Sequence, residues 1–570
     1  MGVPGFLLWF LKKHKDIKFI FENLESYDVP IENFEALMID ANCLLHPMCF
    51  KVLADNPEIG NQTKLEELMI KKCIEYLTFI IETAEPTKLI YIAIDGVAPI
   101  AKIKQQRMRR FKSVKDKEVR DNIKKKHNKK IDTYWNNSAI TPGTDFMNKI
   151  TQGIKDFCKD YNFGDRKVIF STANTPSEGE HKLLQYIRNN DNNGYNYVIY
   201  GLDADLIFLS LSTNKKNIFL LREQQEFNNK VNTNKLNYLS IDKLKECIIR
   251  EIKDLLYNEV IERNLDEESI IRDFVFICYF LGNDFLPHIP SIDIKSYDKK
   301  CVNGLDLLLQ AYANTYDNIE EYIIIIQGAK IHYNQVFLQM FLEYLSTFEE
   351  EFFFNLYNSK KYIRNSDSKD PYQKEIHRIE NLMFKIEDDI ELGKDEKENW
   401  KFRYYTKYYH TEVNQREIVK HACDKYFEGL VWVANYYFNK CPSWNWYYPF
   451  DHAPFISDMA DFVRKCDLNS IDFKLGNPIK PIEQLLSVLP PQSSYLLPSN
   501  CSWLMKSYKS PIIHLYPNSY DLDMLYKRKY WECIPILPDL DIENIQKSLK
   551  LVNLSEKDEK KNKILKEIVY

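Results

Sequence analysis

The chain has 570 residues, 45% of them hydrophobic and 28% charged, and its formal net charge is −5. These values are typical of a soluble globular protein with more than one domain. The net charge is not basic, so it does not by itself indicate a nucleic-acid partner. There is no secretory segment and no apolar run long enough to cross a bilayer, so we expect no membrane association. The 12 cysteines form no CxxC pair. This favours a reducing compartment, and we expect a cytoplasmic protein, with the nucleus as the alternative.

From residue 1 to about 300, strand-like apolar runs alternate with amphipathic stretches. This order predicts an α/β fold with a twisted, largely parallel sheet, in which ligands bind beyond the carboxyl ends of the strands. Five short apolar contexts, four of them strand-like, contain the acidic residues Asp40, Asp95, Glu178, Glu180, Asp203, Asp205 and Asp284. Unpaired carboxylates are costly in apolar surroundings, so we expect a cation to gather them. Oxygen ligands suit Mg²⁺ or Mn²⁺, which indicates a metal-dependent phosphodiester enzyme.

A basic block follows Asp95: residues 101–130 contain 14 Lys and Arg against 3 Asp and Glu. At helical spacing Lys102, Gln106 and Arg109 share a face, and Arg110 comes next. Cationic and amide donors placed this close to a metal-ligand Asp suit a terminal phosphate. About half of the whole block is equally well explained as a solvated helix face.

The segment SEGEH combines two possible roles. Ser177 and Glu180 have the spacing of a capping box, so Glu180 can cap a helix as well as bind metal. Capping leaves Glu178 unexplained, and Gly179 lets the backbone approach a ligand closely. We therefore place metal binding ahead of capping for both glutamates.

Two further acidic motifs lie downstream. Asp203 and Asp205 have alternate spacing, so in an extended backbone their carboxylates point the same way and repel unless a cation lies between them. Asp284 follows a bulky apolar stretch and likewise needs a partner. His46 and His288, each taken alone, are better explained as structural residues.

The second half of the chain reads differently. Residues 345–400 are polar and acidic, as in a connector or surface insertion. The aromatic-rich runs that follow them predict folded structure again. In SWNWYYP, Trp444 and Trp446 could stack on nucleobases, although aromatic clusters more often form core. We divide the chain into an α/β domain (1–300), a variable helical connector (301–400), a mainly helical second region (401–545) and a charged, solvated helix or tail (546–570).

Together these motifs resemble the XRN family of 5′→3′ exoribonucleases, in a short form that lacks the long C-terminal extensions. The blocks MGVPGF, IDGVAP, ITPGTDFM, TPSEGEHK, YGLDADLI, LGNDFLPH and SWNWYYPFDHAPFISD follow the order of that family over residues 1 to about 540. The resemblance implies a PIN-like nuclease domain joined to a second region that walls the active site.

The resemblance also implies roles for individual residues. The seven acidic residues correspond to the catalytic metal centre, which holds two Mg²⁺ or Mn²⁺ ions. A 5′-monophosphate pocket corresponds to Lys102, Gln106, Arg109 and Arg110. Bases stack between His46 and a tryptophan, either Trp444 or Trp446. Two positions depart from the family pattern: Ile100 replaces a usual basic residue, which predicts weaker phosphate binding, and Cys43 replaces a common glycine.

We therefore expect a processive 5′→3′ exoribonuclease that acts in RNA decay. It would hydrolyse single-stranded RNA with a 5′-monophosphate end to nucleoside 5′-monophosphates by a two-metal-ion mechanism. We expect a monomer, and the sequence names no protein partner. Two alternatives stay open: a 5′ exonuclease or structure-specific flap nuclease acting on DNA, and a catalytically silent RNA-binding scaffold.

Overall fold

The computed structural model describes residues 5–16, 19–22, 33–131, 135–190, 194–225, 231–256, 265–294, 302–359, 368–381, 387–527 and 529–570. The chain forms two compact units, each assembled from separate stretches of sequence. Unit 1 comprises Met1–Glu32, Leu184–Lys361 and Asp388–Gly476, and unit 2 comprises Asn33–Leu183, Tyr362–Glu387 and Asn477–Tyr570. The domain boundaries expected at residues 300, 400 and 545 stay a prediction. The opening block MGVPGF falls largely outside the described residues.

Unit 2 contains three parallel strands, β2 (Ala36–Asp40), β3 (Leu89–Ala93) and β4 (Lys167–Ser171), and the short β12 (Ile568–Val569) pairs antiparallel with β4. The register places Asp40 opposite Ala93, and Ala93 opposite Ser171, so the three parallel strands end level. Every residue of β2 and β3 is buried. Strands buried on both faces read as continuous apolar runs, which is why these segments were recognisable in the sequence.

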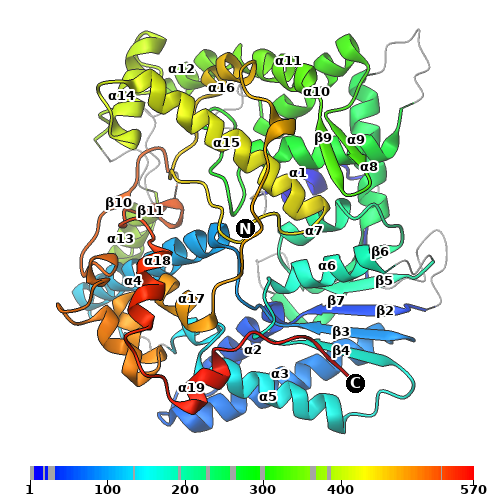
Figure 1. The fold of residues 1–570 in the computed structure, drawn as a ribbon, viewed down its shortest axis with the longest axis vertical. Coiled ribbons are helices and arrows are strands. Elements are labelled where there is room, and N and C mark those ends of the chain that lie inside the picture. Colours follow the sequence, from blue (N-terminus) through cyan, green and yellow to red (C-terminus); the bar gives the residue numbers. More distant parts are fainter. Residues whose placement is uncertain are drawn as a thin grey trace. The chain divides into compact units, whose positions relative to one another are not determined.

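Helices surround these strands within unit 2 (Figure 1). They are α2 (Ala41–Asp55), α3 (Gln62–Ala84), α4 (Ile100–Lys126), α5 (Asp145–Asp160), α13 (Pro371–Glu380), α17 (Pro481–Val488), α18 (Ile542–Leu549) and α19 (Glu556–Lys561). A small strand pair, β10 (Leu522–Asp523) and β11 (Ile534–Pro535), is also present, and α6 (Gly179–Asn189) contains the boundary between the units. Helix α3 packs against α2 and α5, while α4 packs against α13 and α17.

Unit 1 contains four neighbouring strands in the order β1 (Ile20–Phe21), β7 (Val231–Ser240), β6 (Ile218–Gln225) and β5 (Tyr197–Tyr200). The β5–β6 pair is parallel, and the other two pairs are antiparallel. A separate hairpin joins β8 (Ile324–Gln327) to β9 (Lys330–Tyr333). The predicted α/β fold with parallel central strands is confirmed.

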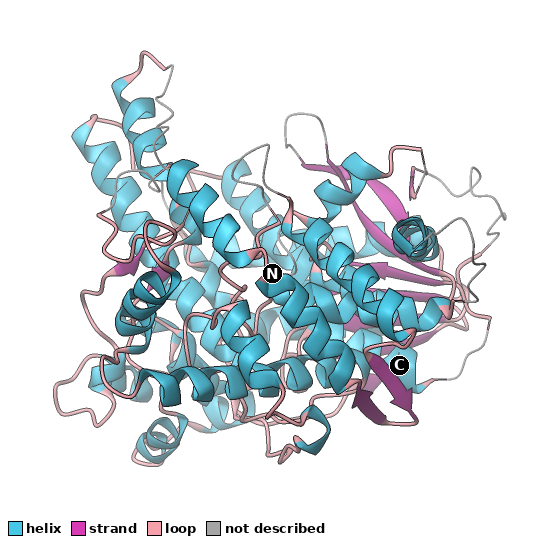
Figure 2. Cartoon of the chain, turned by 90° about the horizontal axis from the view of Figure 1, so that it is seen from above, coloured by secondary structure: helices cyan, strands magenta, loops and turns pink. Residues whose placement is uncertain are grey.

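The remaining helices belong to unit 1, and Figure 2 shows that helices dominate the regular structure. They are α1 (Phe6–Lys13), α7 (Asp205–Leu211), α8 (Ile241–Leu256), α9 (Glu267–Ile277), α10 (Gly304–Ile319), α11 (Gln335–Ser346), α12 (Glu349–Ser359), α14 (Lys397–Tyr409), α15 (Gln415–Phe438) and α16 (Ile456–Val463). The predicted mainly helical second region is therefore confirmed. None of the helices in the described ranges combines the length and apolarity needed to cross a membrane.

Most residues of the charged segment 546–570 are exposed, as expected of a solvated helix or tail. It contains the end of α18, helix α19 and the edge strand β12. Lys561 is only 7% exposed, because it forms ion pairs with Asp145 (2.6 Å) and Asp558 (2.8 Å). Ion pairs and backbone pairing with β4 also hold the segment on unit 2.

A buried carboxylate ties three elements of unit 1 together. Asp273 in α9 is fully buried. Its Oδ2 accepts hydrogen bonds from the Tyr312 hydroxyl (3.0 Å) and the Ile323 N–H (2.8 Å), and its Oδ1 accepts one from the Ile324 N–H (2.8 Å). Burial raises the pKa of Asp273 to about 7, and the three donors only partly oppose this rise.

This raised pKa predicts a specific pH dependence of stability. The contribution of Asp273 is fully present below its ordinary pKa of 3.8 and is lost as pH rises through about 7. We expect the unfolding midpoint in urea to fall between pH 5.5 and 8 by an amount equivalent to a few kcal/mol, at about 1.4 kcal/mol per pKa unit. Asp273→Asn should lack this component although its overall stability is lower, because an amide nitrogen cannot accept the same bonds.

The control is Asp317→Asn, which removes an exposed carboxylate from α10. It should keep the pH slope of the wild-type protein. An unchanged slope in Asp273→Asn would show that Asp273 is not the titrating group.

Candidate active site

The first acidic residue ends a strand of unit 2. Asp40 is the last residue of β2 and precedes α2 directly, and it is 5% exposed. Its Oδ1 accepts a hydrogen bond from the Asn42 N–H (3.1 Å), which caps α2, and its Oδ2 accepts one from the Cys43 thiol (3.1 Å). The strand-to-helix turn thus fixes this carboxylate at the carboxyl end of β2.

Asp95 lies two residues beyond β3, at the same edge of the unit 2 strands. Its Oδ2 accepts a hydrogen bond from Asn42 Nδ2 (2.5 Å), and its Oδ1 accepts one from the Gly179 N–H (2.6 Å). A Cβ at Gly179 would lie 2.7 Å from Asp40 Oδ1 and 3.3 Å from Asp95 Oδ1. The two carboxylates therefore face the same small space, which only a residue without a side chain leaves open.

Residues 172–178 connect β4 to α6 and position the two glutamates. The N–H of Ser177 donates to Val97 O (2.8 Å), and the N–H of Gly96 donates to Ser177 O (2.9 Å). Ser177 has φ 97°, a strained conformation for a residue with a side chain. Helix α6 begins at Gly179, so Glu178 precedes it and Glu180 lies in its first turn. Both glutamates are buried, at 5% and 6% exposure.

The carboxylates of unit 2 influence one another. Burial and the charge of Glu178 raise the pKa of Asp95, the Gly179 N–H, Lys102 and Lys182 lower it, and the net result is a pKa of about 6. Lys182 is buried, and its Nζ donates to Ile94 O (2.6 Å) and Thr172 O (3.1 Å). Burial lowers the pKa of this lysine to about 7, against the attraction of Asp95. Negative charge gathered in this way is the environment that favours a bound cation.

The predicted basic cluster lies on α4, next to these acids and in the same unit. Lys102 is buried in the first turn of α4, and its Nζ is 2.5 Å from Glu178 Oε1. Gln106 Oε1 accepts a hydrogen bond from Gln484 Nε2 (3.3 Å). Gln484 in α17 also accepts one from the Ala98 N–H through its Oε1 (3.1 Å). Lys102 thus links the carboxylate group to the basic cluster.

Arg110 is the member of the cluster best placed to bind an anion. One guanidinium nitrogen, Nη2, donates to Thr141 Oγ1 (2.7 Å), whereas the buried Nη1 has no hydrogen-bond partner among the described residues. Burial lowers the pKa of Arg110 to about 10, so it stays charged at neutral pH. Arg109 is exposed on the neighbouring face. A buried donor without a partner suggests an anionic ligand, because leaving such a group unpaired is costly.

Asp203 and Asp205 lie in unit 1, after β5. Ala204 between them has helical dihedral angles (φ −68°, ψ −26°), and α7 begins at Asp205. The prediction of an extended backbone at this pair is wrong, because the chain is already turning into the helix. As a result Asp203 is exposed and Asp205 is 4% exposed, so the alternate-spacing argument does not apply to them.

Asp284 lies in a tight turn of unit 1 that packs against α15. Asn283 Oδ1 accepts hydrogen bonds from the N–H groups of Phe285 and Leu286, both at 2.9 Å. A Cβ at Gly429 of α15 would lie 2.5 Å from Leu286 Cδ2, so close packing of α15 requires a glycine there. Asp284 itself is 8% exposed. The helical region therefore shapes the turn that carries this carboxylate.

The stacking candidates differ in burial. In unit 1, Trp446 is 9% exposed and stacks on Trp432, with ring centroids 5.2 Å apart and planes 22° apart. Trp444 is half-buried, and its N–H donates to Leu475 O (2.8 Å). His46 is half-buried in α2 of unit 2. One face of Trp446 is thus already occupied, and the choice between the two tryptophans stays a prediction.

The structure brings Asp40, Asp95 and Glu178 together with Lys102 in unit 2. Over the described residues, no three His, Cys, Asp or Glu side chains are gathered closely enough to enclose an ion. Asn42, Lys182 and Gln484 were missed by sequence reasoning. Of these three, only Asn42 could have been found from the sequence, because it lies two residues after the strand-ending Asp40. The partners of Lys182 and Gln484 are distant in sequence and meet them only in the folded unit.

Acidic strand ends beside a cluster of basic side chains on α4 are the arrangement expected of an enzyme that acts on phosphate esters. The family description "XRN 5'-3' exonuclease N-terminus" matches residues 1–224, and "Xrn1 helical domain" matches residues 264–384 and 355–570. The chain therefore belongs to the XRN family of 5′→3′ exoribonucleases.

Several named relatives align with almost the whole chain. The 5'-3' exoribonuclease 2 of Candida albicans is 28% identical over 737 residues, which cover 99% of this chain and 74% of that protein. The 5'-3' exoribonuclease 2 of Arabidopsis thaliana is 29% identical, covering 100% of this chain and 69% of the relative. The human 5'-3' exoribonuclease 1 is 29% identical, covering 99% of this chain but 35% of the human protein.

The small space that Asp40 and Asp95 face predicts how a methyl group added at Gly179 would affect metal binding. Gly179→Ala should push the Asp40 carboxylate aside and weaken Mn²⁺ binding by about 10- to 100-fold, the range for displaced support of a metal site. The melting temperature should fall as well, because a Cβ 2.7 Å from Asp40 Oδ1 forces the buried side chain that caps α2 to shift. Electron paramagnetic resonance of bound Mn²⁺ and thermal unfolding in EDTA measure the two effects.

Gly60→Ala is the matched control, since a Cβ at Gly60 meets nothing within 4 Å. It should leave Mn²⁺ affinity unchanged. Normal Mn²⁺ affinity in Gly179→Ala would contradict a metal site at Asp40 and Asp95.

Proposed function

We propose that the chain degrades single-stranded RNA processively from a 5′-monophosphate end, in the 5′→3′ direction, and releases nucleoside 5′-monophosphates in RNA decay. The observation that carries this proposal is the ion pair of Lys102 with Glu178, since it places a basic pocket directly beside acidic strand ends. A phosphate held on α4 then has its neighbouring phosphodiester close to the carboxylates. The relatives named above, which are 5'-3' exoribonucleases, support the same polarity and substrate class.

The basic cluster supplies selectivity for the 5′ end. Arg110 can offer its unpaired Nη1 to a phosphate oxygen while Nη2 stays bonded to Thr141, and Lys102 can exchange Glu178 for the phosphate. Gln106 and Arg109 complete the proposed pocket on the same helix. Charge-assisted bonds of this kind fit the two negative charges of a terminal monophosphate. A capped or triphosphorylated end would be rejected on size.

The carboxylates fit divalent cations by their chemistry, because they are oxygen donors whose mutual repulsion a cation relieves. We propose that Asp40, Asp95, Glu178, Glu180, Asp203, Asp205 and Asp284 hold two Mg²⁺ or Mn²⁺ ions. Such ions supply Lewis acidity for hydrolysis of a phosphodiester. Asn42 and Gly179 orient Asp95, and Asn283 orients the turn with Asp284. Stacking of the first bases on His46 and on Trp444 or Trp446 would guide the strand.

One RNA with different 5′ ends tests the proposal. We expect release of mononucleotides from the 5′-monophosphate RNA, little from the 5′-hydroxyl or triphosphate RNA, and none in EDTA; a matched DNA strand should be degraded more slowly. Asp205→Asn should lower kcat by about 100- to 1,000-fold, the scale for removing one charged stabilising group, with RNA binding retained. Internal cuts, or preference for DNA, would favour the structure-specific nuclease, and binding without cleavage would favour the scaffold.

The basic pocket predicts a separate effect on end selectivity. Arg110→Met should reduce the advantage of monophosphate over hydroxyl RNA by about 10-fold or more, since a hydrogen bond to a charged group contributes about 1.5–3 kcal/mol. Its effect should fall mainly on KM. Arg120→Met, which changes an exposed arginine of the same helix, is the control and should leave end selectivity unchanged. Equal selectivity in the two variants would argue against the pocket.

A further inference from the structure

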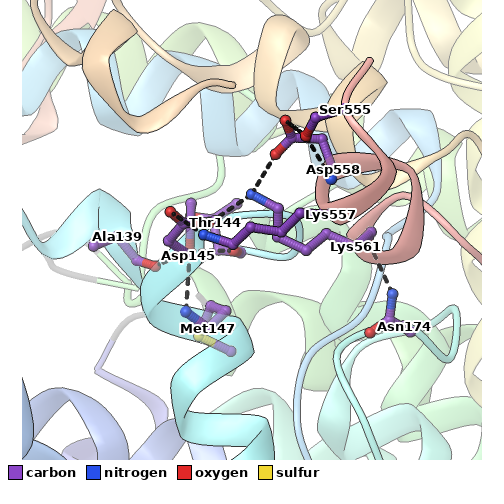
Figure 3. Close-up of polar contacts among 10 residues, drawn as sticks. Ala139, Thr144, Asp145, Met147, Asn174, Ser555, Lys557, Asp558 and Lys561 are labelled. Atoms are coloured by element: carbon purple, nitrogen blue, oxygen red, sulfur yellow. Dashed lines mark hydrogen bonds and ion pairs between the residues drawn. The ribbon is translucent and has the colours of Figure 1, made fainter. Parts of the chain in front are cut away.

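The segment 555–570 of unit 2, here called the strap, contacts α5 and Asn174 of the loop 172–178 that leads to Glu178 (Figure 3). One end is anchored at α5: Lys561 and Lys557 both contact Asp145, at 2.6 and 3.1 Å. Asp145 is the first residue of α5, whose N-cap is Thr144. Helix α19 begins within the strap, where the Ser555 hydroxyl caps it by accepting a hydrogen bond from the Asp558 N–H. Of the anchoring side chains, Lys561 is buried, whereas Lys557 and Asp145 are 67% and 57% exposed.

The middle of the strap holds the loop that carries Glu178. Asn174 Nδ2 donates to Lys561 O (3.0 Å) and Lys563 O (2.7 Å), and the Leu565 N–H donates back to Asn174 O (3.0 Å). Asn174 lies in the loop 172–178, which Gly96 contacts from the other side: a Cβ at Gly96 would lie 1.8 Å from Thr175 O. The loop is thus clamped between Gly96 and the strap.

The end of the strap adds a second connection. Strand β12 pairs with β4, and Glu567 just before it accepts a hydrogen bond from the buried Tyr91 hydroxyl of β3. In the same unit, Lys182 Nζ bridges Ile94 O after β3 and Thr172 O after β4. The contact with Tyr91 therefore ties the strap to β3, the strand that precedes Asp95.

We propose that the strap positions the carboxylate site: Asn174 and Glu567 are positioning residues that hold Glu178, Glu180 and Asp95 in register for divalent cations. Neither residue needs to touch substrate or metal. Asn174 acts on the loop directly, and Glu567 acts through the Tyr91 hydroxyl of β3. This inference rests on the proposed metal site and adds a remote part of the chain to it.

The test measures cation binding apart from catalysis. Asn174→Asp keeps the size of the side chain but cannot donate to the two carbonyls, and Glu567→Gln keeps size but removes the charge. Both should weaken Mn²⁺ binding by about 10-fold or more, the range known for residues that support metal ligands. Mn²⁺ binding is followed by electron paramagnetic resonance well below the melting temperature. In RNA degradation the Mg²⁺ requirement should rise, while KM for RNA at saturating Mg²⁺ stays unchanged.

Two controls separate positioning from folding. Glu556→Gln removes an exposed carboxylate from the same strap, and Asn148→Ala removes an exposed amide from α5. Both should bind Mn²⁺ like the wild-type protein. A purely structural strap would lower the melting temperature of Asn174→Asp and Glu567→Gln without changing Mn²⁺ affinity, and this result would overturn the proposal. Wild-type protein that binds Mn²⁺ but degrades no monophosphate RNA would refute the proposed function alone.

Discussion

The organising constraint in unit 2 is the burial of like charges at the ends of parallel strands. Asp40 and Asp95 follow strands whose register makes them end level, so their carboxylates cannot avoid one another. Asn42 and Gly179 donate N–H groups to Asp95, and two buried lysines, Lys102 and Lys182, lie near the acids. These partners lower the pKa of Asp95 only in part, since burial and the charge of Glu178 keep it raised to about 6. The same compensation leaves a strongly polar site inside an apolar sheet.

The surrounding architecture keeps this polar site in shape. Glycines stand where a side chain would collide with it: Gly179 faces Asp40 and Asp95, and Gly96 lies against the backbone of Thr175. In unit 1, Gly429 allows α15 to reach the turn with Asp284. Rigid elements thus approach the acids closely, and little room is left for the carboxylates to rearrange. The arrangement suits a site that must be formed before its substrate arrives.

Much of this could be predicted from the sequence, because the informative signals were local. Buried parallel strands read as unbroken apolar runs, and α4 showed its basic face at helical spacing. The prediction failed where local conformation changed within three residues: Ala204 is helical, so Asp203 and Asp205 do not share an extended segment. Asn42, Lys182 and Gln484 escaped notice because their partners come from other elements. The exposed helix of the strap fits the prediction, whereas its pairing with β4 left no signal, since charge counts carry no information about backbone pairing.

The bonds between Asn174 and the strap join residues 387 and 389 positions apart in the sequence. Contacts of such separation form late, because the entropy of closing so large a loop must be offset by structure already in place. During synthesis all seven acids leave the ribosome long before the strap does. A nascent or prematurely ended chain would therefore carry the full set of acids yet lack the clamp on its glutamate loop. Activity would thus be coupled to completion of this segment of the polypeptide.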